Sequence, residues 1–315
     1  MAIEVSFCVV NTDGGKLLVR CLDAIAAERA ALAFETEVLV LDNASTDGST
    51  ERARAHPAGA EVVALDERRG KAANDSALLQ RARGTYALLL NEDSELRPGA
   101  TAALHAALEA RPDAALAGAR LLRPDGVAQA SAWAFPSVPR AALGAIGAAR
   151  LNVQSRGDAV REVDWAHSAA LLVRRAPAEA VGWLDPAFFV YSDEVDFARR
   201  LRDAGWRSLH VPAAEAVHHE QLATGAGAQR RIVEFSRNRD RYLRKHHSAP
   251  AAAAVRWLTA LAYAERALAA LVLPGHDARR YRRHVAATLR PARGEGIAEA
   301  ANAFNARRAA GAREP

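Results

Sequence analysis

Carboxylate side chains gather in two short segments of the sequence, and carboxylates can hold divalent cations or remove protons. Asn91-Glu92-Asp93 follows a run of three leucines. A carboxylate such as Asp93 at the end of a strand can bind Mg²⁺ or Mn²⁺ and present it to phosphate oxygens, although a polar loop ahead of a helix has the same composition. Asp193, Glu194 and Asp196 come together at a predicted helix start. They either cap the helix, or one of them serves as a general base.

Three further segments carry groups that suit a nucleotide or a metal. Asp42-Asn-Ala-Ser-Thr-Asp-Gly48 is typical of a turn, and Asp42 can also accept hydrogen bonds from a nucleobase or a ribose. Arg68-Arg-Gly-Lys71 precedes a helix, which favours a phosphate site or a solvated basic turn, but it lacks the spacing of a P-loop. His218-His219 either completes a metal site with Asp93 or is a structural pair.

The first hundred residues alternate between strand-like and helical patterns, and these elements must position the polar groups. The strand-like runs are Val5–Val10, Glu37–Leu41, Glu61–Leu65 and Tyr86–Leu90, and the helical runs are Lys16–Ala30, Thr50–Ala55 and Ala72–Arg83. This alternation predicts a parallel sheet covered by helices, in which ligands bind at the carboxyl ends of the strands. Residues 11–13, 42–47 and 91–93 all lie at such ends.

The remaining chain is patterned less regularly. We expect helices over Pro98–Ala110 and Asp193–Ala204 and from Gln229 onward. We expect strands over Ala114–Leu122 and Ala169–Val173. Residues 134–160 are expected to form a loop or mobile region, and residues 292–315 a frayed or disordered end.

Composition excludes several classes of protein. Half of the 315 residues are hydrophobic, so wholesale disorder is excluded. The net charge of +5 is unevenly spread, because residues 229–315 carry 18 basic and 7 acidic side chains while the rest of the chain is mildly acidic. A uniformly basic nucleic-acid binder is thereby excluded, and we expect no nucleic-acid partner.

Two cysteines, Cys8 and Cys21, cannot form a disulfide framework. The N-terminus reads as a strand and no run of 18 uncharged apolar residues occurs, so we expect a cytoplasmic protein.

The C-terminal region contains an amphipathic pattern that has two interpretations. On a helix from Ala251 to Leu273, five apolar residues share one face, and four arginines follow the helix. The five are Trp257, Leu261, Leu268, Leu271 and Val272, and the arginines are Arg279, Arg280, Arg282 and Arg283. Such a helix either lies on an anionic membrane surface, which would make the protein peripheral at the inner face of the plasma membrane, or packs on the rest of the chain.

In combination, these motifs resemble the family 2 glycosyltransferases with the GT-A fold, and particularly their bacterial rhamnosyltransferase-like branch. The matching segments include Val9-Val-Asn11, residues 37–49, Leu89-Leu-Asn-Glu-Asp93, Asp164-Trp165, residues 169–175, Val181-Gly-Trp-Leu-Asp185, residues 188–196, residues 200–206, Val217-His218 and Arg244-Lys-His-His247. The resemblance implies an α/β fold with a Rossmann-like, mostly parallel sheet in residues 1–228. It places a nucleotide-binding half in residues 1–97 and an acceptor half in residues 98–228. Residues 229–315 form a basic helical extension.

The resemblance also implies roles for nine site residues. Asp93 and His218 fall on the metal site, Thr12, Asp42, Lys71 and Asn91 on the nucleotide site, Glu194 on the catalytic base, Asp193 on the residue that holds the acceptor, and Trp165 beside the sugar subsite.

Four positions depart from the pattern of the family. Asn11-Thr12-Asp13 stands where Asn-Tyr-Asn is usual, and Lys71 stands where an aromatic residue is expected. His167-Ser168 displaces an expected glycine, which indicates an unusual acceptor pocket. The usual Glu-Asp pair is here Asp193-Glu194, which leaves the choice of base between these two residues open.

The reaction implied by the resemblance transfers a sugar from a nucleoside-diphosphate donor to an acceptor hydroxyl with inversion, assisted by Mg²⁺ or Mn²⁺. The branch points to rhamnose from a dTDP donor and to a glycan or lipid-linked acceptor. Two alternatives stand beside it. One is a sugar-nucleotide pyrophosphorylase, although residues 11–16 lack the arginine of its usual phosphate loop. The other is a non-catalytic protein that binds membrane or nucleic acid through its basic C-terminal region.

Overall fold

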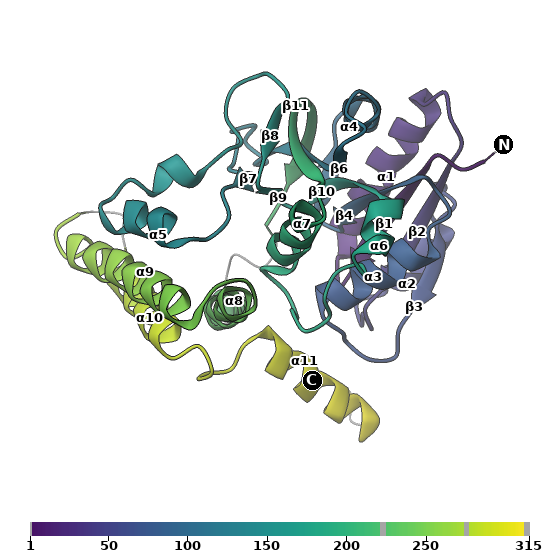
Figure 1. Ribbon diagram of the computed structural model, residues 1–315. Helices are drawn as coiled ribbons and strands as arrows, with labels where there is room; N and C mark the ends of the chain where they lie inside the picture. The colour runs from purple at the N-terminus through teal and green to yellow at the C-terminus, as the bar shows by residue number, and fades with distance from the viewer. Residues whose placement is uncertain (1, 221–224, 274–276, 312–315) are drawn as a thin grey trace.

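The protein is an α/β structure built on one large mixed sheet (Figure 1), as the sequence predicted. The computed structural model describes residues 2–220, 225–273 and 277–311. Within these residues, nine strands form the sheet, in the order β3-β2-β1-β4-β10-β6-β11-β5, with β8 paired to β11. The strands are β1 (Val5–Asn11), β2 (Thr36–Asp42), β3 (Glu61–Ala64), β4 (Tyr86–Asn91), β5 (Ser94–Leu96), β6 (Ala114–Leu122), β8 (Arg161–Val163), β10 (Ala170–Arg174) and β11 (Arg207–His218). A separate two-stranded sheet pairs β7 (Ala132–Trp133) with β9 (Trp165–Ala166).

The first four strands in this order are parallel, and their side chains alternate between two buried faces. Val5, Phe7 and Val9 of β1 belong to one hydrophobic core cluster, whereas Cys8 and Val10 belong to the other. Because both faces are covered, β1 is apolar almost throughout, as parallel strands usually are. β10 interrupts the parallel pattern, since it is antiparallel to both β4 and β6.

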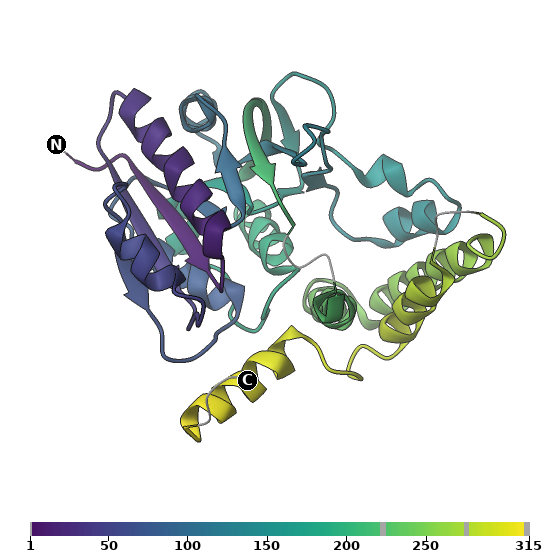
Figure 2. The same ribbon diagram turned by 180° about the vertical axis from the view of Figure 1, so that it is seen from behind.

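Helices cover each face of the sheet with an apolar stripe. The first face carries α1 (Gly15–Ala31), α2 (Ser49–Ala55) and α4 (Ala100–Glu109), which lie in front in Figure 2. The buried residues of α1 recur at helical spacing, at Leu18, Cys21, Leu22 and Ile25. The second face carries α3 (Lys71–Arg81), α6 (Arg175–Ala180) and α7 (Asp193–Asp203). The elements predicted within the first 122 residues are confirmed, and their bounds differ by at most two residues.

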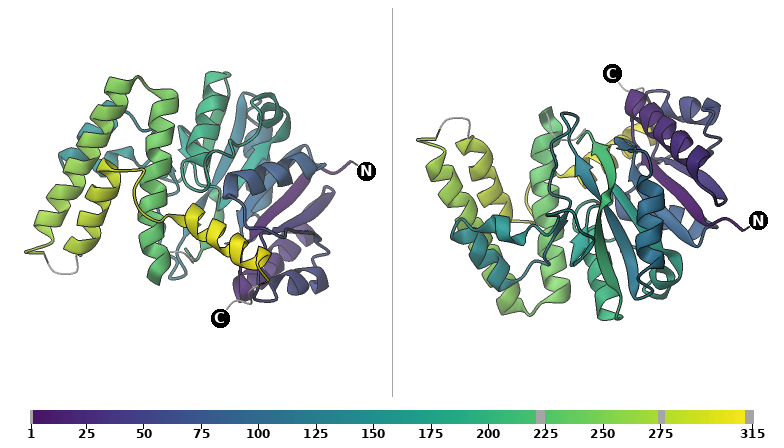
Figure 3. Two further views of the ribbon diagram at one scale, coloured as in Figure 1. Left: turned by 90° about the horizontal axis from the view of Figure 1, so that it is seen from below. Right: turned by 90° about the horizontal axis from the view of Figure 1, so that it is seen from above.

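The C-terminal region continues from the second face. It consists of α8 (Gly225–His246), α9 (Ala249–Ala269), α10 (Ala278–Leu289) and α11 (Ile297–Ala309). The predicted boundary after residue 228 falls in the first turn of α8. Tyr242 and Leu243 of α8 are buried in the same core cluster as Phe197 of α7. α9 and α10 run side by side away from the sheet (Figure 3).

Two expectations about irregular segments are wrong. Residues 134–160, expected as a loop, contain α5 (Val138–Ala145) and a short 3₁₀ turn (Ala149–Asn152), and α5 packs against α9 more than a hundred residues later. The segment 292–315, expected to be frayed, contains α11, in which Ala301 and Phe304 are buried, and its last residues, 312–315, lie outside the described part of the chain. In both segments distant packing partners stabilise helices that local periodicity does not reveal.

Candidate active site

The polar groups at the ends of the parallel strands meet at one edge of the sheet. Asn11 of β1 is paired in register with Asp42 of β2, and its Nδ2 donates to Asp42 Oδ1 at 2.6 Å. Asp42 Oδ2 accepts from the Ser45 N–H at 3.1 Å, and the side chain is almost fully buried. Asp42 therefore organises the turn, and the structure does not bring it to the wall of the cavity described below.

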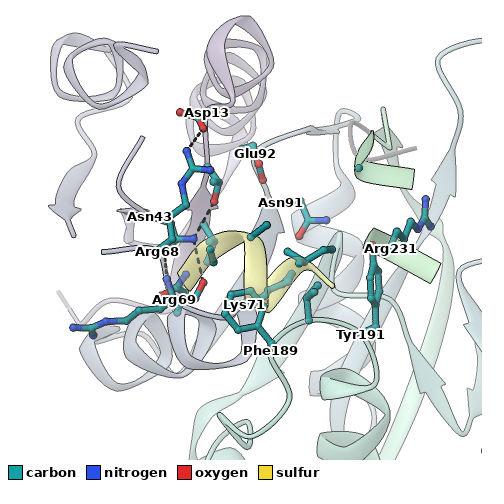
Figure 4. A pocket seen from close by; sticks show the side chains of 18 of the residues that line it. Asp13, Asn43, Arg68, Arg69, Lys71, Asn91, Glu92, Phe189, Tyr191 and Arg231 are labelled. Atoms are coloured by element: carbon teal, nitrogen blue, oxygen red, sulfur yellow. Dashed lines mark hydrogen bonds and ion pairs between the residues drawn. The ribbon is translucent and has the colours of Figure 1, made fainter. Parts of the chain in front are cut away.

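A cavity of about 650 Å³ lies over these strand ends (Figure 4). Its wall contains Thr12, Lys71, Asn91, Asp93, Glu194 and His218 among the nine residues predicted from the sequence. Asp42, Asp193 and Trp165 do not line it. Six predicted residues from five separate stretches of the chain thus face one space.

On the side of the cavity next to β1 and β2, hydrogen bonds fix the wall. Asn43 Nδ2 donates to Thr12 Oγ1 and to the Arg69 carbonyl, both at 3.2 Å. Its Oδ1 accepts from the Arg69 N–H at 2.8 Å. Arg68 pairs with Asp13 across the same edge. This side of the cavity is therefore rigidly built and rich in donors.

Lys71 lies at the first position of α3, where a glycine lets another segment approach. A Cβ at Gly70 would lie 2.8 Å from Phe189 Cα, so the Phe189 backbone can pack there only against glycine. Lys71 Nζ contacts Asp75 Oδ2 at 2.5 Å. Burial lowers the pKa of Lys71, but the carboxylates of Asp75, Asp193 and Glu194 outweigh burial and raise that pKa above its usual value. The cavity therefore contains a permanent cation at a helix N-terminus, which suits a phosphate group.

The end of β11 brings a histidine to the carboxylate that follows β4. His218 is paired in register with Ser94, and the His219 N–H donates to the Asp93 carbonyl at 3.0 Å. As a result, His218 Nε2 lies 3.5 Å from Asp93 Oδ1 and 3.5 Å from Asn91 Nδ2. Burial, together with nearby His167, lowers the pKa of His218 to about 4, so its imidazole is neutral at neutral pH.

A carboxylate, a neutral imidazole and an amide oxygen form a donor set that Mn²⁺ and Mg²⁺ accept, and here they converge on a cavity. The side chains of Asp93, His218 and Asn91 therefore fit a divalent cation. Glu92 also lines the cavity, and burial together with the charge of Asp93 raises the pKa of Glu92 to about 8. Glu92 thus adds little negative charge at neutral pH.

The acidic pair at the start of α7 is divided between the cavity and the protein interior. Glu194 lines the cavity, and its Oε1 accepts a hydrogen bond from Ser168 Oγ at 2.8 Å. Asp193 is fully buried beneath it. Burial and the adjacent charge of Glu194 raise the pKa of Asp193 well above its usual range. Burial also opposes ionisation of Glu194, but His167, Lys71 and Ser168 outweigh it and lower the pKa of Glu194.

The backbone before this pair adopts an uncommon conformation. Tyr191 and Ser192 are consecutive non-glycine residues with φ of 68° and 62°, in the left-handed region. The tight bend places both Tyr191 and Glu194 on the wall of the cavity. Residues held in such conformations often belong to binding or catalytic sites.

Trp165 lies outside the cavity, in the small second sheet. Its ring stacks on Trp133 with centroids 4.6 Å apart. His167, two residues later, does reach the cavity, and its ring lies 5.3 Å from that of His218. Trp165 therefore does not contact the cavity itself, and the segment that carries it reaches the cavity at His167.

Sequence reasoning missed several residues that line the cavity. They are Phe189, Tyr191, Arg230, Arg231, Phe304 and Arg307. Arg68, Arg69 and His167 also line the cavity; the sequence indicates the two arginines as a phosphate site or a basic turn and His167 as a departure in the acceptor pocket. Tyr191 and Arg231 lie on the opposite side from Asp13 and Arg68 in Figure 4. Tyr191 could have been found from its position next to the acidic pair. Nothing in the basic, alanine-rich sequence of the C-terminal region distinguishes Arg231 or Phe304 from its neighbours.

Comparison with known proteins shows that the chain is similar to glycosyltransferases. Residues 6–137 match the model of the glycosyl transferase family 2. The chain is 29% identical over 258 residues to the N-acetylglucosaminyl-diphospho-decaprenol L-rhamnosyltransferase of Mycobacterium tuberculosis, a match that covers 72% of this chain and 82% of that protein. A shorter match, 37% identical over 57 residues, is to the rhamnosyltransferase WbbL of Escherichia coli, and it covers 18% of this chain and 22% of that protein.

Solved structures show the same fold. The mannosyltransferase PcManGT from Pyrobaculum calidifontis, solved with GDP-Man and Mn²⁺, matches with a TM-score of 0.58 at 20% identity over 97% of this chain and 87% of that one. GalNAc-T7, solved with UDP, GalNAc and Mn²⁺, matches with a TM-score of 0.56 at 14% identity over 92% of this chain and 56% of that one. The fold is that of the GT-A glycosyltransferases. Residues 6–137 thus match family 2 of the glycosyltransferases, and the chain is similar to their rhamnosyltransferase-like branch.

Proposed function

We propose that the protein is an inverting glycosyltransferase that moves a sugar, rhamnose from a dTDP donor, to a hydroxyl of a glycan or lipid-linked acceptor. The observation that carries this proposal is the convergence of Lys71, Asp93, His218 and Glu194 on one cavity. Its cationic and metal-binding groups suit a diphosphate, and its carboxylate suits an acceptor hydroxyl. The mycobacterial relative, an N-acetylglucosaminyl-diphospho-decaprenol L-rhamnosyltransferase, supports the choice of rhamnose and of a lipid-linked acceptor.

In this mechanism one group of residues binds the nucleotide and another binds the cation. Thr12, Asn91 and Lys71 bind the nucleotide and its diphosphate, and Asp42 holds the turn beside them. Asp93 and His218 would hold a divalent cation, Mg²⁺ or Mn²⁺, which supplies positive charge against the diphosphate when bound.

Glu194 acts as the base in the proposed reaction. It takes the proton of the acceptor hydroxyl while that oxygen attacks the anomeric carbon, and the bond from that carbon to the diphosphate oxygen breaks. Ser168 orients the Glu194 carboxylate. Asp193 is buried and does not contact the acceptor directly. It affects use of the acceptor by keeping the Glu194 carboxylate in place and ionised.

The test is a donor screen with the full chain. dTDP-rhamnose, UDP-GlcNAc and GDP-mannose are each incubated with Mg²⁺ or Mn²⁺ and a polyprenyl-diphosphate-linked N-acetylglucosamine. Release of nucleoside diphosphate is measured, and the anomeric configuration of the product is read by NMR. We expect release that depends on acceptor, is fastest with dTDP-rhamnose, and gives an inverted product. A retained configuration would contradict the mechanism, and preference for another donor would correct the sugar.

We further propose that the C-terminal helices bring the enzyme to an anionic membrane surface. Trp257, Leu261 and Leu268 of α9 are between 49% and 67% exposed, so the apolar stripe does not pack on the rest of the described chain. Leu271 and Val272, expected on the same helix, lie in the turn that follows α9 and are 62% and 82% exposed. The opposite, more polar face packs inward instead. Tyr263 stacks on His284 of α10 with ring centroids 4.4 Å apart, and Arg256 pairs with Asp240 of α8.

Charge next to this stripe supports a lipid partner. Arg279, Arg280, Arg282 and Arg283 of α10 are all exposed. An exposed apolar stripe beside arginines suits an anionic bilayer surface. No helix in the described part of the chain combines the length and the hydropathy that crossing a bilayer requires.

Vesicle flotation tests the membrane proposal. We expect the protein to float with vesicles containing phosphatidylglycerol, less so at high salt, and weakly with neutral phosphatidylcholine. Val272→Ser should reduce flotation, whereas Val127→Ser, at a 49% exposed valine outside these helices, should not. Equal flotation of the two variants, or a concentration-dependent dimer in which this stripe is covered, would overturn the proposal.

A further inference from the structure

The last helix of the chain forms one wall of the cavity. Ile297, Ala300, Ala301, Phe304 and Arg307 of α11 all line it, and they lie on one face of the helix at helical spacing. These residues are more than 200 positions from the strand ends they face. Figure 3 shows α11 crossing from the C-terminal helices toward the sheet.

Specific contacts hold the far half of α11 against the segment that follows β3. Asn305 Oδ1 accepts from the Arg68 N–H at 2.7 Å, and Asn305 Nδ2 donates to the Arg68 carbonyl at 3.0 Å. The Arg68 guanidinium lies 3.8 Å from the centroid of the Phe304 ring, and Phe304 is 5% exposed. Asn305 thus satisfies both backbone groups of Arg68, which also pairs with Asp13 on the cavity wall.

The near half of α11 is anchored on α8. The Ala298 N–H donates to Glu234 Oε2 at 3.1 Å, and Arg237 Nη1 donates to both oxygens of Glu299 at 2.8 and 2.9 Å. Since α11 is anchored at both ends and about 650 Å³ of the cavity stays open beside it, the helix bounds the cavity and does not fill it. A space of this size accepts a ligand as large as a nucleotide sugar.

The order of the strands indicates which part of the donor lies against α11. Asp93 and His218, which suit the diphosphate, lie near the end of β4, and Glu194 accepts a hydrogen bond from Ser168, two residues before β10. Arg68 follows β3, on the other side of β1 and β2. A donor whose diphosphate lies at Asp93 and whose sugar faces Glu194 therefore extends its nucleoside toward Arg68 and α11.

From these contacts we infer that α11 completes the donor site and forms the wall for the nucleoside, with Phe304 and Ala301 as apolar surface and Arg307 as a polar contact. Asn305 is a positioning residue, because it acts through the Arg68 backbone. This inference rests on the proposed function and adds that the C-terminal helix takes part in nucleotide recognition. Donor binding then couples to the order of α11.

Two matched pairs of variants on α11 test the inference in the full chain. Asn305→Ala removes the contacts to Arg68, whereas Asn302→Ala changes an exposed asparagine that does not line the cavity. Arg307→Ala and Arg308→Ala remove the same charge from two exposed positions, of which only Arg307 lines the cavity. We expect Asn305→Ala and Arg307→Ala to raise the Kd for dTDP with Mg²⁺ by about three- to tenfold, the scale of one or two lost hydrogen bonds. The two controls should bind like wild type.

Hydrogen exchange supplies a second readout that needs no variant. We expect saturating dTDP to slow amide exchange both in residues 66–71 and in residues 297–309. Slower exchange at residues 66–71 alone, or Kd values that do not separate the members of each pair, would overturn this inference while the proposed function stands. Faster exchange in α11 would overturn it in favour of a helix that the nucleotide displaces. If wild type bound none of dTDP, UDP and GDP, the proposed function itself would fail.

Discussion

Ser168 Oγ donates a hydrogen bond to Glu194 Oε1 at 2.8 Å, and this contact joins the segment after β9 to the start of α7. Ser168 itself is fully buried, whereas Glu194 lines the cavity. Asp193, which directly precedes Glu194 in the sequence, is buried, and its pKa is raised. One carboxylate of the pair therefore faces the cavity in its ionised form, while the other lies in the interior and favours its protonated form.

Glu194→Gln tests the assignment of the base. Glutamine keeps the shape of the side chain and can still accept the hydrogen bond from Ser168, but it cannot take a proton. We expect kcat to fall by roughly 10²–10⁴, the usual contribution of a general base, while the Kd of the donor stays near the wild-type value. Steady-state kinetics and calorimetric titration with donor measure the two quantities separately.

Asp193→Asn and Ser168→Ala serve as comparisons for this variant. Because both residues act through Glu194, we expect each to lower kcat by less than Glu194→Gln does. Asp193→Asn should impair acceptor use more than donor hydrolysis. Normal turnover by Glu194→Gln together with an inactive Asp193→Asn would move the base by one residue.

Asp93→Asn tests the cation site. Asparagine removes the charge that a divalent cation needs but keeps the size of the side chain. We expect donor binding to lose its dependence on Mg²⁺ or Mn²⁺ and turnover to fall at least a hundredfold, while the melting temperature changes little. Asp66→Asn, at an exposed aspartate outside the cavity, is the matched control. Full turnover of the wild type in excess chelator would contradict the site.

The sequence predicts one half of the cavity better than the other, and the reason is physical. Asn91 and Asp93 follow a strand whose buried apolar run is plain in the sequence, so their position at the sheet edge follows from strand geometry. Thr12 is placed by the same argument, and Lys71 by its position at the start of a helix. These contributions to the site depend on local patterns that the chain displays within a few residues.

The other half depends on contacts between distant segments. Phe304 reaches the cavity because Asn305 binds the backbone of Arg68, 237 positions away, and no local pattern shows this pairing. Asp42 was predicted at the nucleotide, but Asn11 and Ser45 turn it inward. The apolar stripe that contains Trp257 shows a helix clearly, yet the sequence alone leaves open whether that stripe faces the protein or the solvent.

Glu37→Gln tests how one buried carboxylate contributes to stability at different pH. Glu37 accepts hydrogen bonds from Ser6 Oγ at 2.6 Å and from the Arg83 N–H and Nε, both at 2.7 Å. Burial by itself raises the pKa of Glu37, but these bonds outweigh it and lower the pKa below its usual value. A carboxylate with a lowered pKa stabilises the fold above the pKa it has when unfolded, and that contribution is lost as the pH falls through its folded value.

We therefore expect Glu37→Gln to lower the unfolding free energy at pH 7 by about 1–3 kcal/mol, as is usual for charged hydrogen bonds, and by less as the pH falls below about 4.5. Urea unfolding at several pH values measures the difference. Glu35→Gln, at an exposed neighbouring glutamate, should change little at any pH. A deficit of Glu37→Gln that stays constant between pH 7 and pH 3 would contradict the assignment.

Asp196→Ala tests the link between the helix that carries Glu194 and the helix that carries Arg231. Asp196 of α7 is fully buried and contacts Arg200 of its own helix at 2.8 Å, and Lys245 and His246 of α8 at 2.8 and 2.7 Å. Removing it takes the buried carboxylate from Arg200 and His246, while Lys245 keeps Asp185 at 2.6 Å, so we expect a loss of about 3–5 kcal/mol in urea unfolding, the scale for breaking a buried ion pair. Asp203→Ala removes an exposed aspartate that pairs with Arg199 on α7, and it should cost less than about 1 kcal/mol. Equal losses in the two variants would show that α7 and α8 are held together by apolar packing alone.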